Sequence, residues 1–438
     1  SLLLEAFEKY PSNSRIQNEL NVINNIIVKK KINELSSLFE QEQYWDVKDK
    51  CLELINNYPS NYILYNIAGA VHSRLNDYKK AEVFYIHALS INPNCDKILS
   101  NLSETQNQLN KYKLAEINCL KALKINPKSE NALINLGISK LETNEFKQAI
   151  KLFNKCIYVN PENILARINL ANAYCKNFNY VEAISIFKNI FHFIKNNAEI
   201  LNLFSHALNK NRKFDESLNV LKLSLDLNSQ IPETYKLFAN TYAGMGDNIK
   251  AIEYLLVAIS LDRENSSLYN YLGVLQAEEK IFDDALNSFN KSLSINPDEP
   301  RPKFNKSLIF LRRGNFNNGW DLYDEGINNN IREINKLYFN EKKEVWDGLS
   351  FDGTLLVYDE QGVGDQILFG TLLSDLIKIQ SKVIVKIDQR LINLFSRTFK
   401  KIQFIPADQH LQSNLYEKYV SIGSLPKYLR KSFSQFEN

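Results

Sequence analysis

The sequence has few cysteines, and neither cysteine nor histidine occurs in a pattern suited to a bridge or a metal. Its five cysteines are odd in number, widely spaced and include no C-x-x-C pair. This argues against a disulfide framework and against a zinc site. We therefore expect them to be small buried residues. The five histidines also lack metal-ligand spacing, so no metal site is predicted.

Long apolar runs and dense basic stretches are missing too. No apolar run reaches about 18 residues, and the opening "SLLLEAFEKYPSN" has no basic segment or cleavage site. We expect no membrane span and a cytoplasmic location. The net charge of +3 is small and no Lys/Arg stripe is interleaved with aromatics, so nucleic acid is not a predicted partner. Met245 is the only methionine, and we expect a fragment or a processed form.

Internal repetition is the strongest positive feature of the sequence. Pro93, Pro127 and Pro161 lie 34 residues apart, and Pro297 stands in the same register. Three positions of this register hold small residues. The first set is Ala81, Ala115, Ala149, Ala183, Ser217, Ala251, Ala285 and Gly319. The second is Ala88, Ala122, Cys156, Ile190, Ser224, Ala258, Ser292 and Gly326, with one large member. The third is Gly69, Ser103, Gly137, Ala171, Ser205, Ala239, Gly273 and Ser307.

Small residues at fixed positions allow the two helices of a pair to approach closely, and aromatic residues fill the remaining volume. We expect Tyr85, Phe153, Phe187 and Phe289 to do so. The pattern resembles the tetratricopeptide repeat family, which implies a mainly α fold with about eight helix pairs over residues 62–330. Residues 1–61 depart from the small-residue pattern, and we interpret them as a degenerate N-terminal helical cap.

Asparagine recurs on the first helix of several repeats, on the face that such superhelices present to a partner. The recurring residues are Asn66, Asn101, Asn135, Asn169, Asn202, Asn270 and Asn305. An asparagine amide can bind a peptide backbone through both its acceptor and its donors. The ladder predicts binding of a protein or an extended peptide in the concave face. The alternative is that these residues only reflect a chain rich in asparagine.

After a linker at residues 331–353, the pattern changes to alternating strands and helices. We predict strands at about 354–359, 382–388, 402–406 and 419–422, with helices near 365–380 and 389–399. Such alternation indicates a parallel sheet, here a Rossmann-like half-domain over residues 354–438. The turn Gly362-x-Gly364 has Ile367 where a third glycine would stand, so dinucleotide binding is not expected.

The segments "WDG" at 346–348 and "EQGVGD" at 360–365 resemble bacterial tetratricopeptide proteins that carry a C-terminal glycosyltransferase domain of the heptosyltransferase-like GT-B type. The resemblance implies that Asp365 is the base that deprotonates an acceptor hydroxyl. It also places four residues in the acceptor crevice: Glu360, Gln361, Gly362 and Gly364. An alternative reading makes Asp365 an ordinary helix N-cap.

A GT-B enzyme needs a second Rossmann domain to hold its nucleotide-sugar donor. The sequence stops at Asn438, so we expect the donor half to be absent and the domain to be truncated. A nucleotide sugar is expected only for a complete enzyme, and no cofactor is predicted for this chain. Two functions remain open: a peptide-binding superhelix joined to the acceptor half of a glycosyltransferase, or a non-enzymatic scaffold for protein interactions.

Overall fold

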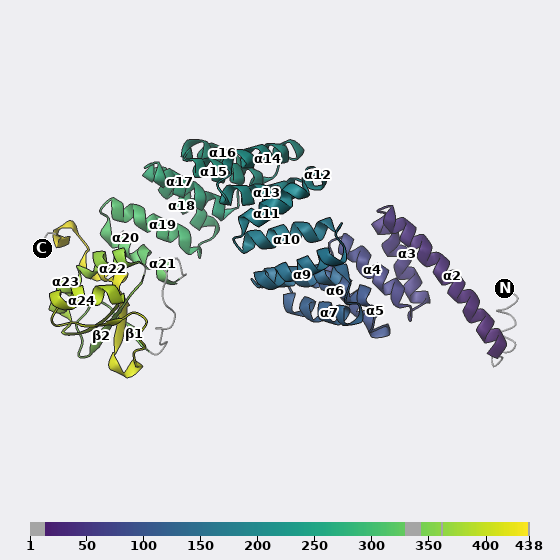
Figure 1. Cartoon of the computed structure of the whole chain (residues 1–438), viewed down its shortest axis with the longest axis horizontal. Coiled ribbons are helices and arrows are strands. Elements are labelled where there is room, and N and C mark those ends of the chain that lie inside the picture. Colours follow the sequence, from purple (N-terminus) through teal and green to yellow (C-terminus); the bar gives the residue numbers. More distant parts are fainter. Residues whose placement is uncertain (1–13, 329–342, 361, 437–438) are drawn as a thin grey trace. The chain divides into compact units, whose positions relative to one another are not determined.

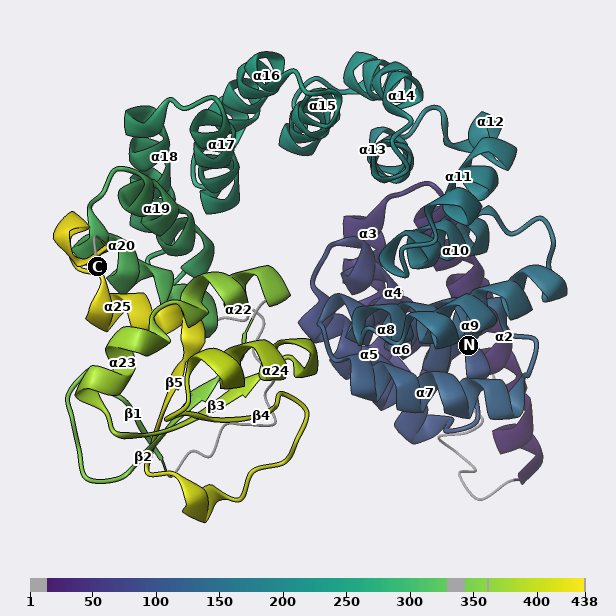
Figure 2. The ribbon, with the colours of Figure 1, turned by 60° about the vertical axis from the view of Figure 1, so that its left-hand side comes forward.

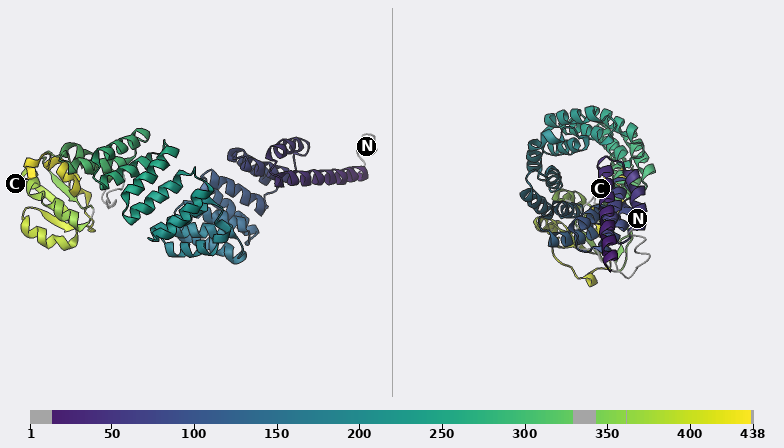
Figure 3. Two further views of the ribbon diagram at one scale, coloured as in Figure 1. Left: turned by 90° about the horizontal axis from the view of Figure 1, so that it is seen from above. Right: turned by 90° about the vertical axis from the view of Figure 1, so that its right-hand side faces the viewer.

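The computed structural model describes residues 14–328, 343–360 and 362–436 of the chain (Figure 1). Two compact units are present, Ser1–Leu227 and Asn228–Asn438. Within each unit, consecutive helices pack as antiparallel pairs (Figure 3). Among the described residues, strands occur only in the second unit. None of the described helices combines the length and the apolar character needed to cross a membrane.

The described residues of the first unit, from Ser14 onward, form helices joined by short turns. Its helices are α2 (Ser14–Glu40), α3 (Tyr44–Asn57), α4 (Tyr62–Arg74), α5 (Tyr78–Ile91), α6 (Asp96–Gln108), α7 (Tyr112–Ile125), α8 (Glu130–Glu142), α9 (Phe146–Val159), α10 (Ile164–Lys176), α11 (Tyr180–Asn189), α12 (Phe191–Ile194), α13 (Ala198–Lys210) and α14 (Phe214–Leu227). The second unit continues the series. Its solenoid helices are α15 (Pro232–Met245), α16 (Asn248–Leu261), α17 (Ser266–Glu278), α18 (Phe282–Ile295), α19 (Pro300–Arg312), α20 (Phe316–Tyr323) and α21 (Glu325–Asn328).

The 34-residue register is visible in the backbone of the turn between the two helices of each pair. One residue per turn has positive φ, a conformation that favours glycine and asparagine. These residues are Glu42, Asn76, Asn110, Asn144, Phe178, Arg212, Gly246, Lys280 and Gly314. Every spacing is 34 residues. Because the series begins at Glu42, the register extends into α2 and α3, within the segment interpreted as a degenerate cap.

All three sets of small residues are buried, as the register predicts. Where the first helix has glycine, an aromatic ring of the second helix occupies the space. A Cβ built on Gly137 would lie 2.5 Å from Phe153, and Gly69 and Gly273 meet Tyr85 and Phe289 in the same way. The expected role of Tyr85, Phe153 and Phe289 is thus confirmed. Upstream, the same positions hold Leu35, Val47 and Leu54, which are also buried.

Ile190 is the large member of the second set, and the helix is interrupted at this residue. Its φ and ψ of −101° and 9° separate α11 from α12. The side chain is fully buried in the same core cluster as Phe187 and Ala171. A branched side chain needs more room than alanine or serine, and we attribute the break in the second helix to this volume.

The C-terminal module is a five-stranded parallel sheet in the order β1-β5-β2-β3-β4 (Figure 2). Its strands are β1 (Glu344–Val345), β2 (Thr354–Tyr358), β3 (Lys382–Ile387), β4 (Gln403–Pro406) and β5 (Lys418–Ser421). Its helices are α22 (Val363–Gly370), α23 (Leu373–Ile379), α24 (Gln389–Thr398), α25 (Leu425–Leu429) and the short 3-10 turns η2 (Ser413–Leu415), η3 (Ile422–Ser424) and η4 (Phe433–Phe436).

The main core of this module lies on one face of the sheet. Alternate strand residues such as Leu355 and Val357 pack there against side chains of α22, α23, α24 and α25. Strand β1 was not predicted from the sequence, and Trp346 was expected to lie in a linker. Trp346 is fully buried in this core, and its Nε1 donates a hydrogen bond to the Leu349 carbonyl oxygen at 2.8 Å. The single helix expected near 365–380 is divided into α22 and α23.

Hydrogen bonds and aromatic packing connect the last solenoid helices to the module. Trp320 Nε1 of α20 donates to the Arg430 carbonyl oxygen at 2.9 Å, and Ser424 Oγ donates to Asp324 Oδ1 at 2.7 Å. Phe316 packs against Phe433 at a ring distance of 4.9 Å. Helix α25 thus lies beside α20 (Figure 2), and the module is anchored on the end of the solenoid.

Candidate functional site

The predicted asparagine ladder forms hydrogen bonds between neighbouring repeats. Asn101 Nδ2 on α6 donates to Asn66 Oδ1 on α4 at 3.1 Å. The pair is repeated in the second unit, where Asn305 Nδ2 donates to Asn270 Oδ1 at 3.0 Å. Each of these four side chains is only partly buried. One role of the ladder is therefore to connect the first helices of consecutive repeats.

Other asparagines of the ladder are buried or form hydrogen bonds within the protein. Asn135 is 6% exposed, and its Nδ2 donates to the Ser100 carbonyl oxygen at 2.9 Å. Asn202 is equally buried, and its Oδ1 accepts a hydrogen bond from Ser224. Asn169 Nδ2 donates to the Leu165 carbonyl oxygen of its own helix at 2.9 Å. Burial leaves Asn135 and Asn202 little surface for a ligand.

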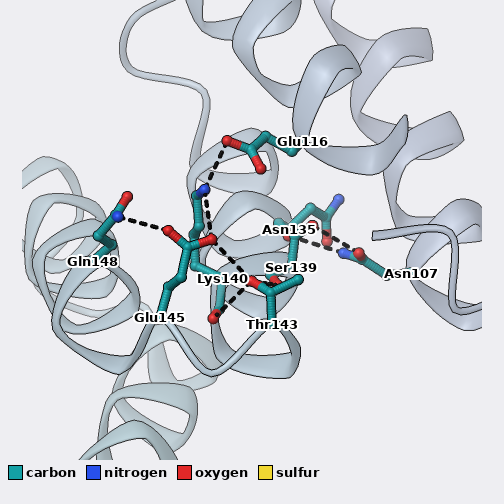
Figure 4. Close-up of polar contacts among 8 residues, drawn as sticks. All are labelled: Asn107, Glu116, Asn135, Ser139, Lys140, Thr143, Glu145 and Gln148. Atoms are coloured by element: carbon teal, nitrogen blue, oxygen red, sulfur yellow. Dashed lines mark hydrogen bonds and ion pairs between the residues drawn. The ribbon is translucent and has the colours of Figure 1, made fainter. Parts of the chain in front are cut away.

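A polar network surrounds Asn135 and reaches the next helix pair (Figure 4). Asn107 Nδ2 donates to the Asn135 carbonyl oxygen at 2.9 Å, and Ser139 Oγ donates to Asn107 Oδ1 at 2.8 Å. Nearby, Lys140 Nζ lies 2.7 Å from Glu116 Oε1 and 3.0 Å from Glu145 Oε1. Burial disfavours the charged form of Lys140 and lowers its pKa. The carboxylates of Glu116 and Glu145 together raise the pKa by more, so the net effect is a raised pKa. The network stabilises the stacking of repeats.

A groove lies over the first helices α4 and α6, where the ladder begins. It encloses about 420 Å³ and includes Asn101 in its lining. Its other polar walls are Ser73 and Arg74 of α4 and Glu104 of α6, while Phe39 of α2 contributes an aromatic wall. Ala70 also lines it, and this small side chain leaves the space open. A groove of this size and polarity suits a short ligand segment.

His72 lies next to the groove residue Ser73, but its side chain is buried and stacks on Phe84 at a ring distance of 5.1 Å. Its Nδ1 is 3.5 Å from Asp77 Oδ2. Burial lowers the pKa of His72, the Asp77 carboxylate raises it, and Lys80 and Lys48 lower it further. The net effect is a lowered pKa, so the ring is neutral at neutral pH.

The second candidate site lies at the carboxyl ends of β2 and β5. The sheet order changes direction between these two neighbouring strands. From β2 the chain adds β3 and β4 on one side of the sheet, and it then adds β5 on the other side of β2. Tyr358 pairs with Ser421 at this edge. Ligands of open α/β sheets bind in the crevice at such a point. Glu360 is buried and lies two residues after the end of β2.

The N-cap interpretation of Asp365 is wrong. Helix α22 begins at Val363, and its N-cap is Gly362 in an extended conformation, with φ −78° and ψ 171°. Asp365 lies in the first turn of the helix, where its charge is still favourable to the helix dipole. A Cβ built on Gly364 would meet no atom within 4 Å, so the turn is open above this residue. Gln361 lies outside the described residues.

Sequence reasoning missed two charged residues at the same edge of the sheet. Asp359 follows β2, and burial raises the pKa of its carboxyl group. Lys386 of β3 is fully buried; its Nζ donates to the Gln409 carbonyl oxygen at 2.7 Å, and burial lowers its pKa. The available signal was their position at the ends of apolar strands, where charge is unexpected.

Four of the five cysteines are core residues, as the sequence predicted, whereas Cys95 at the start of α6 is only half-buried. Cys51, Cys119, Cys156 and Cys175 are buried. Burial raises the pKa of Cys51, Cys119 and Cys175 to about 12, which suppresses the reactive thiolate. Within residues 14–328, 343–360 and 362–436, no cluster of three or more His, Cys, Asp or Glu side chains could hold a metal ion.

Comparison with known proteins supports the helical repeats. The tetratricopeptide repeat model matches residues 62–95, 96–129, 130–163 and 232–265. Protein FlbA of Caulobacter vibrioides is 22% identical over 190 residues, which cover 42% of this chain and 31% of that protein. The chain thus spans about a third of the length of this relative.

Two solved structures align with parts of this chain. The Cut9-Hcn1 hetero-tetramer of the APC/C aligns with a TM-score of 0.51 and 16% identity, over 67% of this chain and 58% of that one. A tetratricopeptide repeat protein from Parabacteroides merdae aligns with a TM-score of 0.46 and 17% identity, over 57% of this chain and 98% of that one. The chain thus contains tetratricopeptide repeats at residues 62–163 and 232–265, within a helical solenoid that keeps a 34-residue register, and an α/β module follows the solenoid.

Proposed function

We propose that this chain is a scaffold that binds a protein partner through an extended peptide segment on the first helices of its repeats. The observation that carries the proposal is the open groove over α4 and α6, which includes the predicted residue Asn101 in its lining. We assign this role to the solenoid of residues 62–330, and we propose that the α/β module, from β1 onward, is a separate domain.

The partly exposed asparagines would contact the peptide backbone. In the Asn66–Asn101 pair, one donor and one acceptor are used by the hydrogen bond between them. An amide side chain has two donor hydrogens and an acceptor oxygen. Asn101 Oδ1 and Asn66 Nδ2 therefore remain for a ligand. We propose the same role for the pair Asn270–Asn305, because it repeats this geometry.

The experiment measures binding of a fluorescein-labelled pool of random hexapeptides by fluorescence polarisation. Replacing Asn66 and Asn101 together by Ala should weaken binding by about tenfold, at about 0.5–1.5 kcal/mol for each hydrogen bond lost. Asn154 is the matched control, because it is exposed on the second helix α9 and bonds only to its own helix at Ile150. If the Asn66/Asn101 variant binds like the wild type while its circular dichroism is unchanged, the asparagines have no role in binding.

A second candidate function concerns the α/β module. We propose that it corresponds to the acceptor side of a heptosyltransferase-like glycosyltransferase, with Asp365 as the base. Glu360, Gln361, Gly362 and Gly364 would bind the acceptor. The observation that favours this is the position of Asp365 beside an open glycine turn, next to the point where the strand order reverses. A carboxylate there could accept a proton from a hydroxyl group in the crevice.

The test is Asp365→Asn in the full-length protein, assayed for sugar transfer from a panel of nucleotide sugars to the bound partner. Loss of a general base lowers a rate by about 10²–10⁴-fold. Since Asp365 is not the cap, stability should change only through the helix dipole, by about 0.3–1 kcal/mol. Equal transfer by both proteins would exclude Asp365 as the base. Absence of transfer by the wild type over the whole panel would favour the scaffold alone.

A further inference from the structure

The groove over α4 and α6 holds two opposite charges that do not pair with each other. Arg74 is the last residue of α4, Glu104 lies on α6, and both are exposed. Neither side chain forms an ion pair or a hydrogen bond within the part of the chain that the structure describes. Elsewhere in this unit, charges of neighbouring repeats do pair, as in Lys111–Glu82 at 2.6 Å and Lys176–Glu142 at 3.0 Å.

The lining of the groove is also polar, and hydrogen bonds between side chains hold its polar groups in place without using all their donors and acceptors. Ser73 and Thr105 share a hydrogen bond at 3.2 Å, so their hydroxyl groups are held between α4 and α6. The Asn66–Asn101 bond fixes a second pair of polar groups on the same two helices. Preorganised side chains reduce the entropy lost when a ligand binds. The lining therefore supplies fixed partners for a backbone, and the rim supplies charge.

We propose that this groove binds a short extended peptide segment that carries one acidic and one basic side chain, the acidic one at Arg74 and the basic one at Glu104. The inference rests on the proposed function, since it specifies which peptides that site selects. Arginine forms bidentate hydrogen bonds with a carboxylate. Opposite charges on the rim also fix the direction in which the segment runs, because the reversed segment brings like charges together.

The size of the groove favours a segment of a few residues over a folded domain. A volume of about 420 Å³ lies within the usual range for sites of small ligands. Phe39 and Tyr78 also line the groove. Their rings can cover the aliphatic part of a lysine or arginine side chain and attract its charge.

The experiment uses the full chain and three sets of fluorescein-labelled hexapeptides built on alanine. The first set carries Glu before Lys with every possible separation, the second carries Lys before Glu, and the third has Gln at both positions. We expect one order to bind about tenfold more tightly than its Gln counterpart, which is the lower end of the effect of a hydrogen bond to a charged group. This preference should decrease as salt is added.

The charge-swapped variant R74E/E104R provides the sharpest readout. It should prefer the opposite order of Glu and Lys, a reversal that general weakening of the fold does not produce. Lys113→Ala is the control, since Lys113 is exposed on the second helix α7. It should bind every set as the wild type does.

Two outcomes would overturn the inference in different ways. If the wild type binds the Gln peptides as tightly as the charged ones, and Asn66→Ala with Asn101→Ala weakens both, the charge selection is wrong and the proposed function stands. If no peptide of any set binds the wild type and the random pool does not bind either, both the inference and the proposed function fail.

Discussion

The contact between Gly137 and Phe153 provides a direct test of how the helix pairs are packed. Gly137 lies within α8, and a Cβ at this position would be 2.5 Å from Phe153 Cε1 and 2.7 Å from Cζ. Carbon atoms prefer a separation of about 3.5–4.0 Å, so the Gly137→Ala methyl group overlaps the ring by about 1 Å. Phe153 is fully buried and has no solvent-exposed space to move into.

Two effects of opposite sign therefore compete in Gly137→Ala. In a helix without the ring, Ala would stabilise the protein by about 0.8–1 kcal/mol relative to Gly. Overpacking a well-packed core costs about 1–3 kcal/mol. We expect the overlap to dominate, with a net destabilisation of about 1 kcal/mol. Equilibrium unfolding in urea, followed by circular dichroism, measures the change.

A double-mutant cycle separates the two effects. Phe153→Leu removes the ring, and in that background Gly137→Ala should be neutral or stabilising. The coupling between the two positions should therefore be at least about 1 kcal/mol, the range seen for residues in contact. If Gly137→Ala stabilises the otherwise unaltered protein, or if the cycle shows no coupling, the packing of glycine against the ring is refuted.

Three further predictions concern the register and the buried histidine. Ala149→Leu should destabilise by about 1–3 kcal/mol because Ala149 is fully buried, whereas the exposed Lys147→Leu should change little; equal urea midpoints would contradict the register. Gly246→Ala should cost about 1–2 kcal/mol from its φ of 88° alone, since no atom lies within 4 Å of the added Cβ; an unchanged midpoint would exclude this strain. The lowered pKa of His72 means that below its ordinary pKa of 6.5 the unfolded chain binds a proton that the folded chain does not. Stability should therefore fall as pH decreases through this range, and less so in His72→Gln; parallel pH profiles would contradict it.

The sequence was sufficient to predict the repeats because their signal is local and recurs many times. A small residue such as Ala149 or Gly137 is enough to allow two helices to approach closely. The aromatic ring that packs on the glycine lies at a constant distance along the sequence from it. The break at Ile190 follows from the same logic, because a large residue occupies a position reserved for small ones. Strands β2, β3, β4 and β5 were equally predictable, since each is a short, mainly apolar run.

Other features depend on contacts between segments distant in the sequence. Strand β1 has two residues and is defined only by its pairing with β5, so no local pattern marks it. Trp346 reads as part of a linker until the sheet that buries it is known. The asparagines looked equivalent along the chain, yet Asn135 is buried and Asn101 lines a groove, because the neighbouring side chains differ between repeats.

The central claim is that ligands bind on the first helices of the repeats. Site-specific photo-crosslinking of the labelled hexapeptide pool tests this claim most directly. A photoreactive benzoylphenylalanine would replace Gln108, which lines the groove on α6, or Lys113, which is exposed on the second helix α7. The account predicts that label is incorporated at position 108, that it is reduced by Asn66→Ala with Asn101→Ala, and that position 113 remains at background. Equal labelling at both positions, or labelling at 113 alone, would contradict it.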